Sequence, residues 1–206
     1  MDIIVIANHR RPPVITEFLE GIPHRICWSD DPPMPSSIVI KPEYRGLCSN
    51  HVAAYRCLVA HQKALGMMSG EFALVFEDDA HPVQDYNWKR LVALAGDWRE
   101  RFAVISFHGR GYNPWGWQKQ DCPFGWGSFH FWIPPDGQPL TKICGASMVY
   151  LINREAAKRY QEIVYDGLPA DWLLTTVGKF ALVEPSPFWH DRKHGSLIEV
   201  RPEDNP

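Results

Sequence analysis

Three adjacent carboxylates, Glu77-Asp78-Asp79, are the residues whose types and spacing best suit chemistry. They follow five apolar residues, from Phe72 to Phe76, which have the pattern of a buried strand. Carboxylates crowded at the end of such a strand repel one another unless a cation offsets their charge. Hard divalent cations take carboxylate oxygens and often complete their coordination with substrate phosphates. The cluster therefore predicts a site for a metal-bound nucleotide, with a solvated acidic turn as the alternative.

The elements that must position these carboxylates alternate between strands and helices. Apolar runs predict strands at residues 3–7, 25–28, 38–40, 71–76, 102–107, 146–152 and 180–183. Helical patterns lie at residues 14–20, 50–65, 86–98, 154–165 and 171–177, and Asn50 and Asn153 are candidate N-caps. Pro82 is expected to bar direct continuation into a sheet after the carboxylates. The predicted class is α/β with a parallel or mixed sheet, in which ligands bind beyond the carboxyl ends of the strands.

Composition narrows the class of protein. The chain has 206 residues, which suits a single α/β domain over residues 1–206, and a hydrophobic fraction of 45% is typical of a packed protein. A net charge of -3 gives no general attraction to polyanions, so a nucleic acid would need a local basic surface. The five cysteines have no Cys-x-x-Cys spacing, which favours reduced thiols in a cytoplasmic protein over a zinc site. No run approaches the ~20 apolar residues of a transmembrane segment.

A long segment at about residues 108–140 is rich in glycine, proline and aromatic residues. Its aromatic side chains include Tyr112, Trp115, Trp117 and Trp126. Aromatic faces stack on sugars or on unpaired bases, and the glycines would let the segment close as a lid. These four residues are therefore candidates for acceptor binding. The alternative is a hydrophobic cluster packed beneath a long loop.

Residues 72–80 resemble the acidic motif of glycosyltransferase family 25, the lipopolysaccharide and collagen galactosyltransferase-like family. Three further segments agree with that family in order and spacing. Residues 57–65 resemble its helix with a small-residue–His pair, although Ala60 stands where serine is usual. Residues 145–157 resemble its Tyr-Leu-Ile strand and following helix, and residues 169–171 resemble its Pro-x-Asp turn.

The resemblance implies a GT-A (Rossmann-like) fold with a mixed, mostly parallel central sheet flanked by helices. It also implies a metal-dependent inverting glycosyltransferase (a hexosyltransferase) that uses Mn²⁺ or Mg²⁺. The donor would be a nucleotide-sugar, commonly UDP-glucose or UDP-galactose. The acceptor would be a hydroxyl group of a glycan, a protein or a modified DNA base, and the resemblance does not decide among them. A DNA base would have to be flipped out of a duplex.

The resemblance also assigns roles on the donor side. It makes Asp79 and Glu77 metal ligands, with His190 completing the metal shell and an exposed surface histidine as the alternative. Glu77 and Asp78 would bind the metal or the ribose. Further donor contacts would come from Asn8 and Arg10 after the first strand and from His61 on the long helix. The alternatives are a solvated loop arginine and a buried histidine that is satisfied by a backbone carbonyl.

Asp171 is the candidate general base, because it matches the later acidic position of the family and an inverting transfer needs a base for the acceptor proton. The alternative is that Asp171 caps a helix beginning at Trp172.

Two other classes of function use the same features. A metal-dependent nuclease or phosphoesterase also needs several carboxylates, although they typically come from separate strands. A non-catalytic sugar- or nucleic-acid-binding module would use the aromatic segment instead. The family-like segment that begins at Gly145 favours the glycosyltransferase over both.

Overall fold

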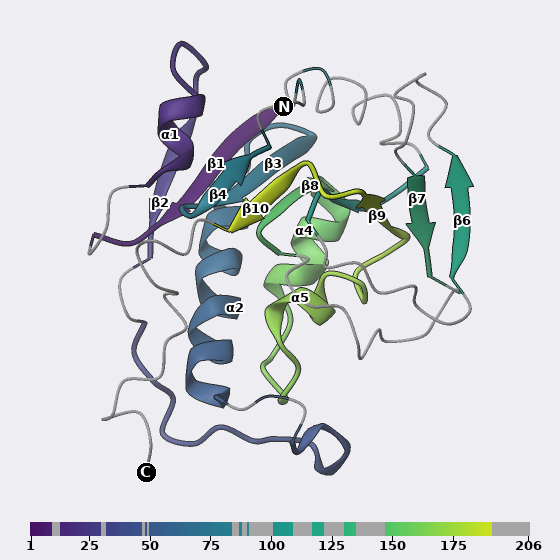
Figure 1. Ribbon diagram of the computed structural model, residues 1–206. Coiled ribbons are helices and arrows are strands. Elements are labelled where there is room, and N and C mark those ends of the chain that lie inside the picture. Colours follow the sequence, from purple (N-terminus) through teal and green to yellow (C-terminus); the bar gives the residue numbers. More distant parts are fainter. Residues whose placement is uncertain are drawn as a thin grey trace.

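A mixed eight-stranded sheet lies at the centre of the structure, a computed structural model (Figure 1). The structure describes residues 1–9, 13–29, 32–46, 48, 50–83, 87, 90, 101–108, 117–121, 130–134 and 147–190. In sheet order the strands are β2 (Arg25–Trp28), β1 (Asp2–Ala7), β3 (Phe72–Glu77), β8 (Val149–Asn153), β5 (Val104–Ser106), β9 (Phe180–Glu184), β7 (His130–Ile133) and β6 (Gln118–Asp121). The pairings make β8 and β7 antiparallel to their neighbours, so the other six strands run in one direction. The α/β class with a mixed, mostly parallel sheet is confirmed.

Both faces of the sheet are covered, which explains the continuous apolar runs in its strands. Side chains alternate along β1, so Ile4 and Ile6 enter one core while Val5 and Ala7 enter the other. The first core is completed by α2 (His51–Gly66), α4 (Arg154–Gln161) and α5 (Ala170–Leu173). The second core lies beneath α1 (Ile15–Phe18) and two short strands. The sheet is thus the middle of three layers, and α2 projects beyond it (Figure 1).

The two short strands, β4 (Ala80–Pro82) and β10 (Phe188–His190), form a separate antiparallel pair. The expectation that Pro82 bars direct continuation into a sheet was wrong, because Pro82 itself pairs with Phe188. The chain turns at Asp78 and Asp79 and leaves the main sheet, and Pro82 lies in β4, an edge strand of a two-stranded sheet, where a missing N–H is tolerated.

Helices α2 and α4 begin directly after the asparagines that were predicted to cap them. The side chain of Asn50 accepts a hydrogen bond from the Ala53 N–H at 2.9 Å, and that of Asn153 accepts one from the Ala156 N–H at 2.8 Å. The helices over residues 14–20, 154–165 and 171–177 are shorter than predicted, and most of the one predicted at 86–98 lies outside the described residues.

The strand predicted at residues 38–40 was wrong. The structure assigns no strand there, and the Val39 side chain is exposed although Ile38 packs against the core. Ile38 therefore contacts the core although residues 38–40 have no neighbouring strand to pair with.

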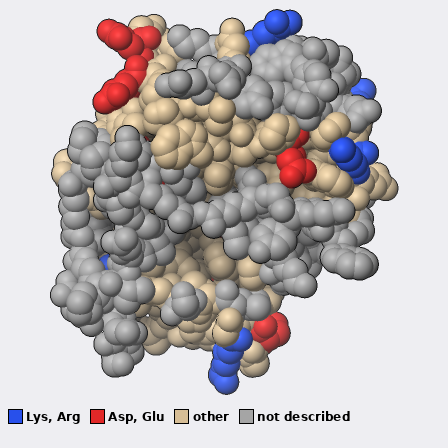
Figure 2. All heavy atoms as spheres, viewed as in Figure 1, with Lys and Arg blue, Asp and Glu red and all other residues tan. Residues whose placement is uncertain are grey.

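The described surface shows no large region of one charge on the face in Figure 2. Its described lysine, arginine and acidic side chains are scattered, mostly around the rim. None of the helices in the described part of the chain has the length and hydropathy of a membrane span.

Asp2 anchors the start of β1 and gives a prediction for acid stability. Its carboxylate accepts hydrogen bonds from the N–H groups of Ser69 and Gly70, both at 2.7 Å, and pairs with Arg25 at 2.8 Å. Burial raises the pKa of Asp2, but the hydrogen bonds from Gly70 and Ser69 and the charge of Arg25 outweigh it and lower the pKa from 3.8 to about 2.

Because the folded-state pKa is depressed, the stabilisation by Asp2 is present above pH 3.8 and is lost as the pH falls towards about 2. Its size is about 2 kcal/mol. We expect Asp2→Asn to lower the free energy of unfolding at pH 6 and to reduce the loss of stability between pH 5 and pH 2. Urea unfolding across this pH range measures both effects. An unchanged slope in the variant would contradict the assignment.

Candidate functional site

The acidic cluster lies at the carboxyl edge of the sheet, beside the start of β8. Glu77 is the last residue of β3, and its N–H donates to the Met148 carbonyl at 2.8 Å. Because β8 runs antiparallel to β3, its first residues come next to the last residues of β3. This topology places Ser147 beside Glu77 although 70 residues separate them in the chain.

Two of the three carboxylates are almost removed from water. Asp78 is 1% exposed and Asp79 is 8% exposed, and both lie in the turn between β3 and β4. Adjacent buried carboxylates cost free energy unless hydrogen bonds or a cation offset their charges. The burial therefore argues against the solvated acidic turn.

Ser147 joins the acidic cluster to Asp171. The Ser147 hydroxyl lies 2.9 Å from Glu77 Oε1 and also contacts Asp171 Oδ1, which accepts a further hydrogen bond from the Ser147 N–H at 3.2 Å. A serine hydroxyl has one proton, so it donates to only one of the two carboxylates at a time. Glu77 and Asp171 are thus held on either side of one side chain.

Asp171 does not cap a helix, which corrects the alternative derived from the sequence. Helix α5 begins at Ala170, and its N-cap residue is Pro169. Asp171 lies in the first turn, where a carboxylate also interacts favourably with the exposed backbone N–H groups. Its carboxylate points to Ser147 and so belongs to the cluster at the edge of the sheet.

His61 is buried between two side chains. Its Nε2 lies 3.2 Å from Glu77 Oε1, and its Nδ1 lies 2.9 Å from the Tyr150 hydroxyl. A neutral imidazole satisfies both contacts if Nε2–H donates to Glu77 and Nδ1 accepts from Tyr150. The expectation of a backbone carbonyl partner was wrong, because a carboxylate and a phenol occupy these positions.

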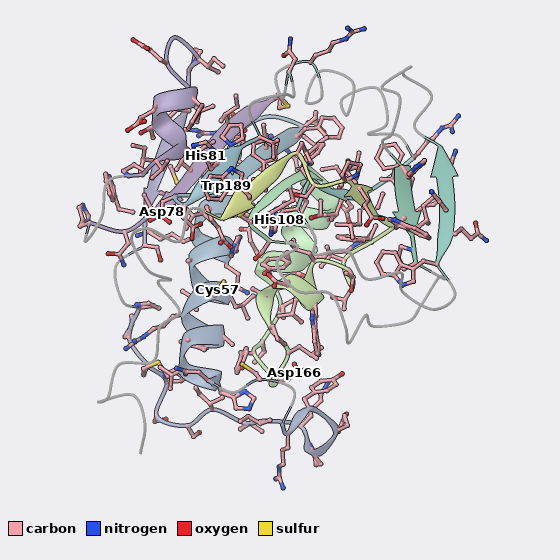
Figure 3. The ribbon with its side chains drawn as sticks, viewed as in Figure 1. Cys57, Asp78, His81, His108, Asp166 and Trp189 are labelled. Atoms are coloured by element: carbon pink, nitrogen blue, oxygen red, sulfur yellow. The ribbon has the colours of Figure 1, made fainter. Side chains whose placement is uncertain are left out.

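Cys57 was not among the residues selected from the sequence. It lies on α2 (Figure 3), one turn before His61, and its thiol lies within 4.8 Å of the ligand atoms of His61 and Glu77. Burial raises the pKa of the Cys57 thiol well above its usual value, and the charges of Glu77, Asp171 and Asp79 raise it further. The carboxylates that act on the thiol come from the end of β3, the β3–β4 turn and α5. The i,i+4 spacing of Cys57 and His61 was the signal in the sequence.

The β4–β10 pair brings the C-terminal part of the described chain to the acidic cluster. His190 pairs with Ala80, the residue after Asp79. The backbone of His190 therefore lies next to the turn that carries Asp78 and Asp79. The structure does not describe the His190 side chain, so its role as a metal ligand stays a prediction.

Asn8 also lies at this edge, directly after β1. Its side chain donates to the Ser29 carbonyl at 3.3 Å and so joins the ends of β1 and β2. Beside it, His9 stacks on Trp28 with ring centroids 4.1 Å apart. Arg10 lies outside the described residues.

Trp117 is placed away from this edge. It precedes β6, and its ring lies edge-on to Phe180, with centroids 6.4 Å apart. Phe180 is the first residue of β9, which runs parallel to β5 and in the same direction as β3, so both rings lie at the edge opposite Glu77. Trp117 thus makes a packing contact away from Glu77, and its acceptor role stays a prediction. Tyr112, Trp115 and Trp126 lie outside the described residues.

Ser147→Ala tests the link between Glu77 and Asp171. Removing the hydroxyl leaves two partly buried carboxylates without their shared donor, so we expect the free energy of unfolding to fall by about 1–3 kcal/mol. Urea denaturation measures the change. Ser69→Ala is a matched control, because Ser69 also bonds an aspartate, Asp2, at 3.0 Å but at an exposed position. Equal losses in the two variants would contradict a special role for the buried link.

Comparisons with known proteins find similar solved structures but no related family or curated sequence. No protein-family model matches the chain, and no curated protein matches it significantly. Among solved structures, A197 from STIV is similar with a TM-score of 0.48 and 12% identity over 92% of this chain and 85% of that chain. A glycosyltransferase involved in the glycosylation of the major capsid of PBCV-1 is similar with a TM-score of 0.41 and 12% identity, over 78% of this chain and 64% of that chain. Both TM-scores are below 0.5, so these similarities do not establish a function.

Proposed function

We propose that this protein is a metal-dependent inverting glycosyltransferase that moves a hexose from a nucleotide-sugar to a hydroxyl acceptor. One observation carries the proposal: Ser147 joins Glu77, the last residue of β3, to the carboxylate of Asp171 at the carboxyl edge of the sheet. An inverting transfer needs both parts, a site for the donor phosphates and a base for the acceptor. The motifs that resemble family 25 support the same reaction and a GT-A fold over residues 1–206.

The acidic turn is the proposed metal site. Asp79 is the main ligand in this proposal, assisted by Glu77 and by His190 from the strand that pairs beside it. Carboxylate oxygens in a nearly buried turn suit Mn²⁺ or Mg²⁺, because the cation offsets charges that burial makes costly. When bound, the metal would neutralise the nucleoside diphosphate that leaves the sugar.

The donor nucleotide, UDP in this proposal, would lie along the ends of β1, β2 and β3. Asn8 fits this location, because it joins the ends of two of these strands, and Arg10 follows it in the chain. Asp78 would help to bind the metal or the ribose. His61 has both ring nitrogens engaged, so we assign it the task of holding Glu77 in place at the edge of the donor pocket.

Asp171 is the proposed general base. Its carboxylate would accept the proton of the acceptor hydroxyl while that oxygen attacks the anomeric carbon from the face opposite the leaving diphosphate. Ser147 fixes this carboxylate by donating to it from the backbone N–H. Because the Ser147 hydroxyl also contacts Glu77, Ser147 would fix the position of the Asp171 carboxylate relative to the proposed metal site.

The acceptor would be bound by the segment over residues 108–140. Tyr112, Trp115 and Trp126 keep their proposed roles as a stacking surface or lid for a glycan, a protein or a modified DNA base. Among the described residues, the scattered charges in Figure 2 form no basic surface that would support a nucleic-acid acceptor. Cys27, Cys48 and Cys57 are free thiols, which fits the proposed cytoplasmic location.

A panel of nucleotide-sugars tests the reaction. We expect the protein to release UDP from UDP-glucose or UDP-galactose when Mn²⁺ is present, with slow hydrolysis if the acceptor is missing. Magnesium and EDTA series would measure the metal requirement, and single- and double-stranded DNA would serve as nuclease substrates. DNA cleavage without any nucleotide-sugar turnover would replace this proposal with the nuclease.

A further inference from the structure

We propose that Cys57, His61 and Glu77 bind a zinc ion, at a site distinct from the donor metal at Asp79. These three residues are called the Cys57 cluster below. The inference goes beyond the proposed function and does not require it, although the two sites meet at Glu77. The scattered cysteines of the sequence did not predict a zinc site, because its ligands come from one helix and the end of a distant strand.

The spacing of the Cys57 cluster suits one ion. The three ligand atoms lie within 4.8 Å of one another, and His61 Nε2 lies 3.2 Å from Glu77 Oε1. In a tetrahedral zinc site, bonds of about 2.0–2.3 Å place neighbouring ligand atoms about 3.3–3.6 Å apart. The observed separations therefore require only small side-chain movements. Cys57 and His61 are one helical turn apart, so both side chains reach the same face of α2.

The surroundings of His61 are those of a zinc ligand. A histidine that binds metal through one nitrogen usually donates its other ring N–H to a polar neighbour, which fixes the ring. Tyr150 already lies 2.9 Å from Nδ1, on the side of the ring away from Glu77. With zinc on Nε2, the imidazole would carry its proton on Nδ1 and donate it to the Tyr150 oxygen.

Charge also favours a divalent cation in the Cys57 cluster. A thiolate and a carboxylate together carry two negative charges, which a zinc ion neutralises. The carboxylates of Asp79 and Asp171 act on the same thiol and add negative potential. Sulfur and imidazole ligands select zinc over the magnesium or manganese that bind carboxylates and phosphates.

The Cys57 cluster is accessible and leaves one position open. His61 is buried, whereas Cys57 and Glu77 are partly exposed, so an ion can enter from their side. Three protein ligands leave the fourth tetrahedral position for water or another ligand, as in catalytic rather than structural zinc sites.

Metal titrations of the full chain, stripped of metal and free of nucleotide, test the proposal. We expect one Co²⁺ ion to bind with a sulfur-to-cobalt charge-transfer band, and one equivalent of Zn²⁺ to displace it. Cys57→Ser should remove the band, and Cys48→Ser is the matched control that should retain it. A band that survives in Cys57→Ser but not in Cys48→Ser would overturn the assignment.

Zinc-edge X-ray absorption of the wild-type protein keeps the test independent of any variant's folding. We expect one sulfur at about 2.3 Å together with nitrogen and oxygen ligands at about 2.0–2.2 Å. A zinc shell without sulfur, or no zinc bound at one equivalent, would overturn the proposal. Zinc binding without nucleotide-sugar turnover would support the Cys57 cluster and reject the glycosyltransferase, whereas turnover without zinc binding would do the reverse.

Discussion

Asp79→Asn is expected to abolish the manganese-dependent affinity of the protein for UDP. The substitution keeps the size of the side chain and removes the charge that holds the metal between protein and diphosphate. We expect the affinity for UDP in the presence of Mn²⁺ to fall by about 100-fold or more, which corresponds to about 2.8 kcal/mol. Isothermal titration calorimetry with and without Mn²⁺ measures this difference.

Glu155→Gln is the matched control for Asp79→Asn. Glu155 is an exposed carboxylate on α4 that pairs with Arg159 at 3.3 Å, away from the acidic turn. It should bind UDP and Mn²⁺ as the wild-type protein does. If Asp79→Asn also retains full affinity, the metal does not bind at this turn.

Asp171→Asn is expected to stop sugar transfer while donor binding is preserved. The amide has nearly the same shape but cannot accept the acceptor's proton, and general base catalysis contributes about 10²–10⁴-fold to a rate. We therefore expect kcat to fall by that factor, with the affinity for UDP and Mn²⁺ changed by less than about threefold. Steady-state kinetics and calorimetry on the same preparation separate the two quantities.

Asp171→Glu gives a second test of the base. It restores a carboxylate on a longer side chain, so it should recover part of the rate lost in Asp171→Asn. Loss of donor binding in Asp171→Asn would show instead that Asp171 supports the donor pocket. A normal rate in that variant would show that another group accepts the proton.

The central elements of the fold were predictable because their signals are local. The apolar run before Glu77 predicted a strand buried on both faces, and the asparagines at positions 50 and 153 capped the helices that they were expected to cap. The strand at residues 38–40 failed because strand formation needs a partner, which no local pattern supplies. The prediction for Pro82 failed for a similar reason, because the strand that pairs with it, β10, lies more than a hundred residues later in the chain.

The acidic cluster was predictable from the sequence, but the side chains that contact it were not. Glu77, Asp78 and Asp79 are adjacent in the chain, whereas Ser147 reaches Glu77 only because β8 pairs antiparallel with β3. The partners of His61 depend on the same pairing, because Tyr150 lies on β8. Cys57 was not selected because a single cysteine inside a helix normally behaves as a small apolar residue.

The location of manganese in crystals grown with UDP and Mn²⁺ tests the central claim most directly. Anomalous scattering identifies the ion without reference to activity or to any variant. The account predicts a manganese peak within coordination distance of the Asp79 carboxylate and of both phosphates of UDP, at the carboxyl end of β3. A manganese–UDP complex bound elsewhere on the molecule, or saturating UDP and Mn²⁺ that leave no density at this turn, would contradict it.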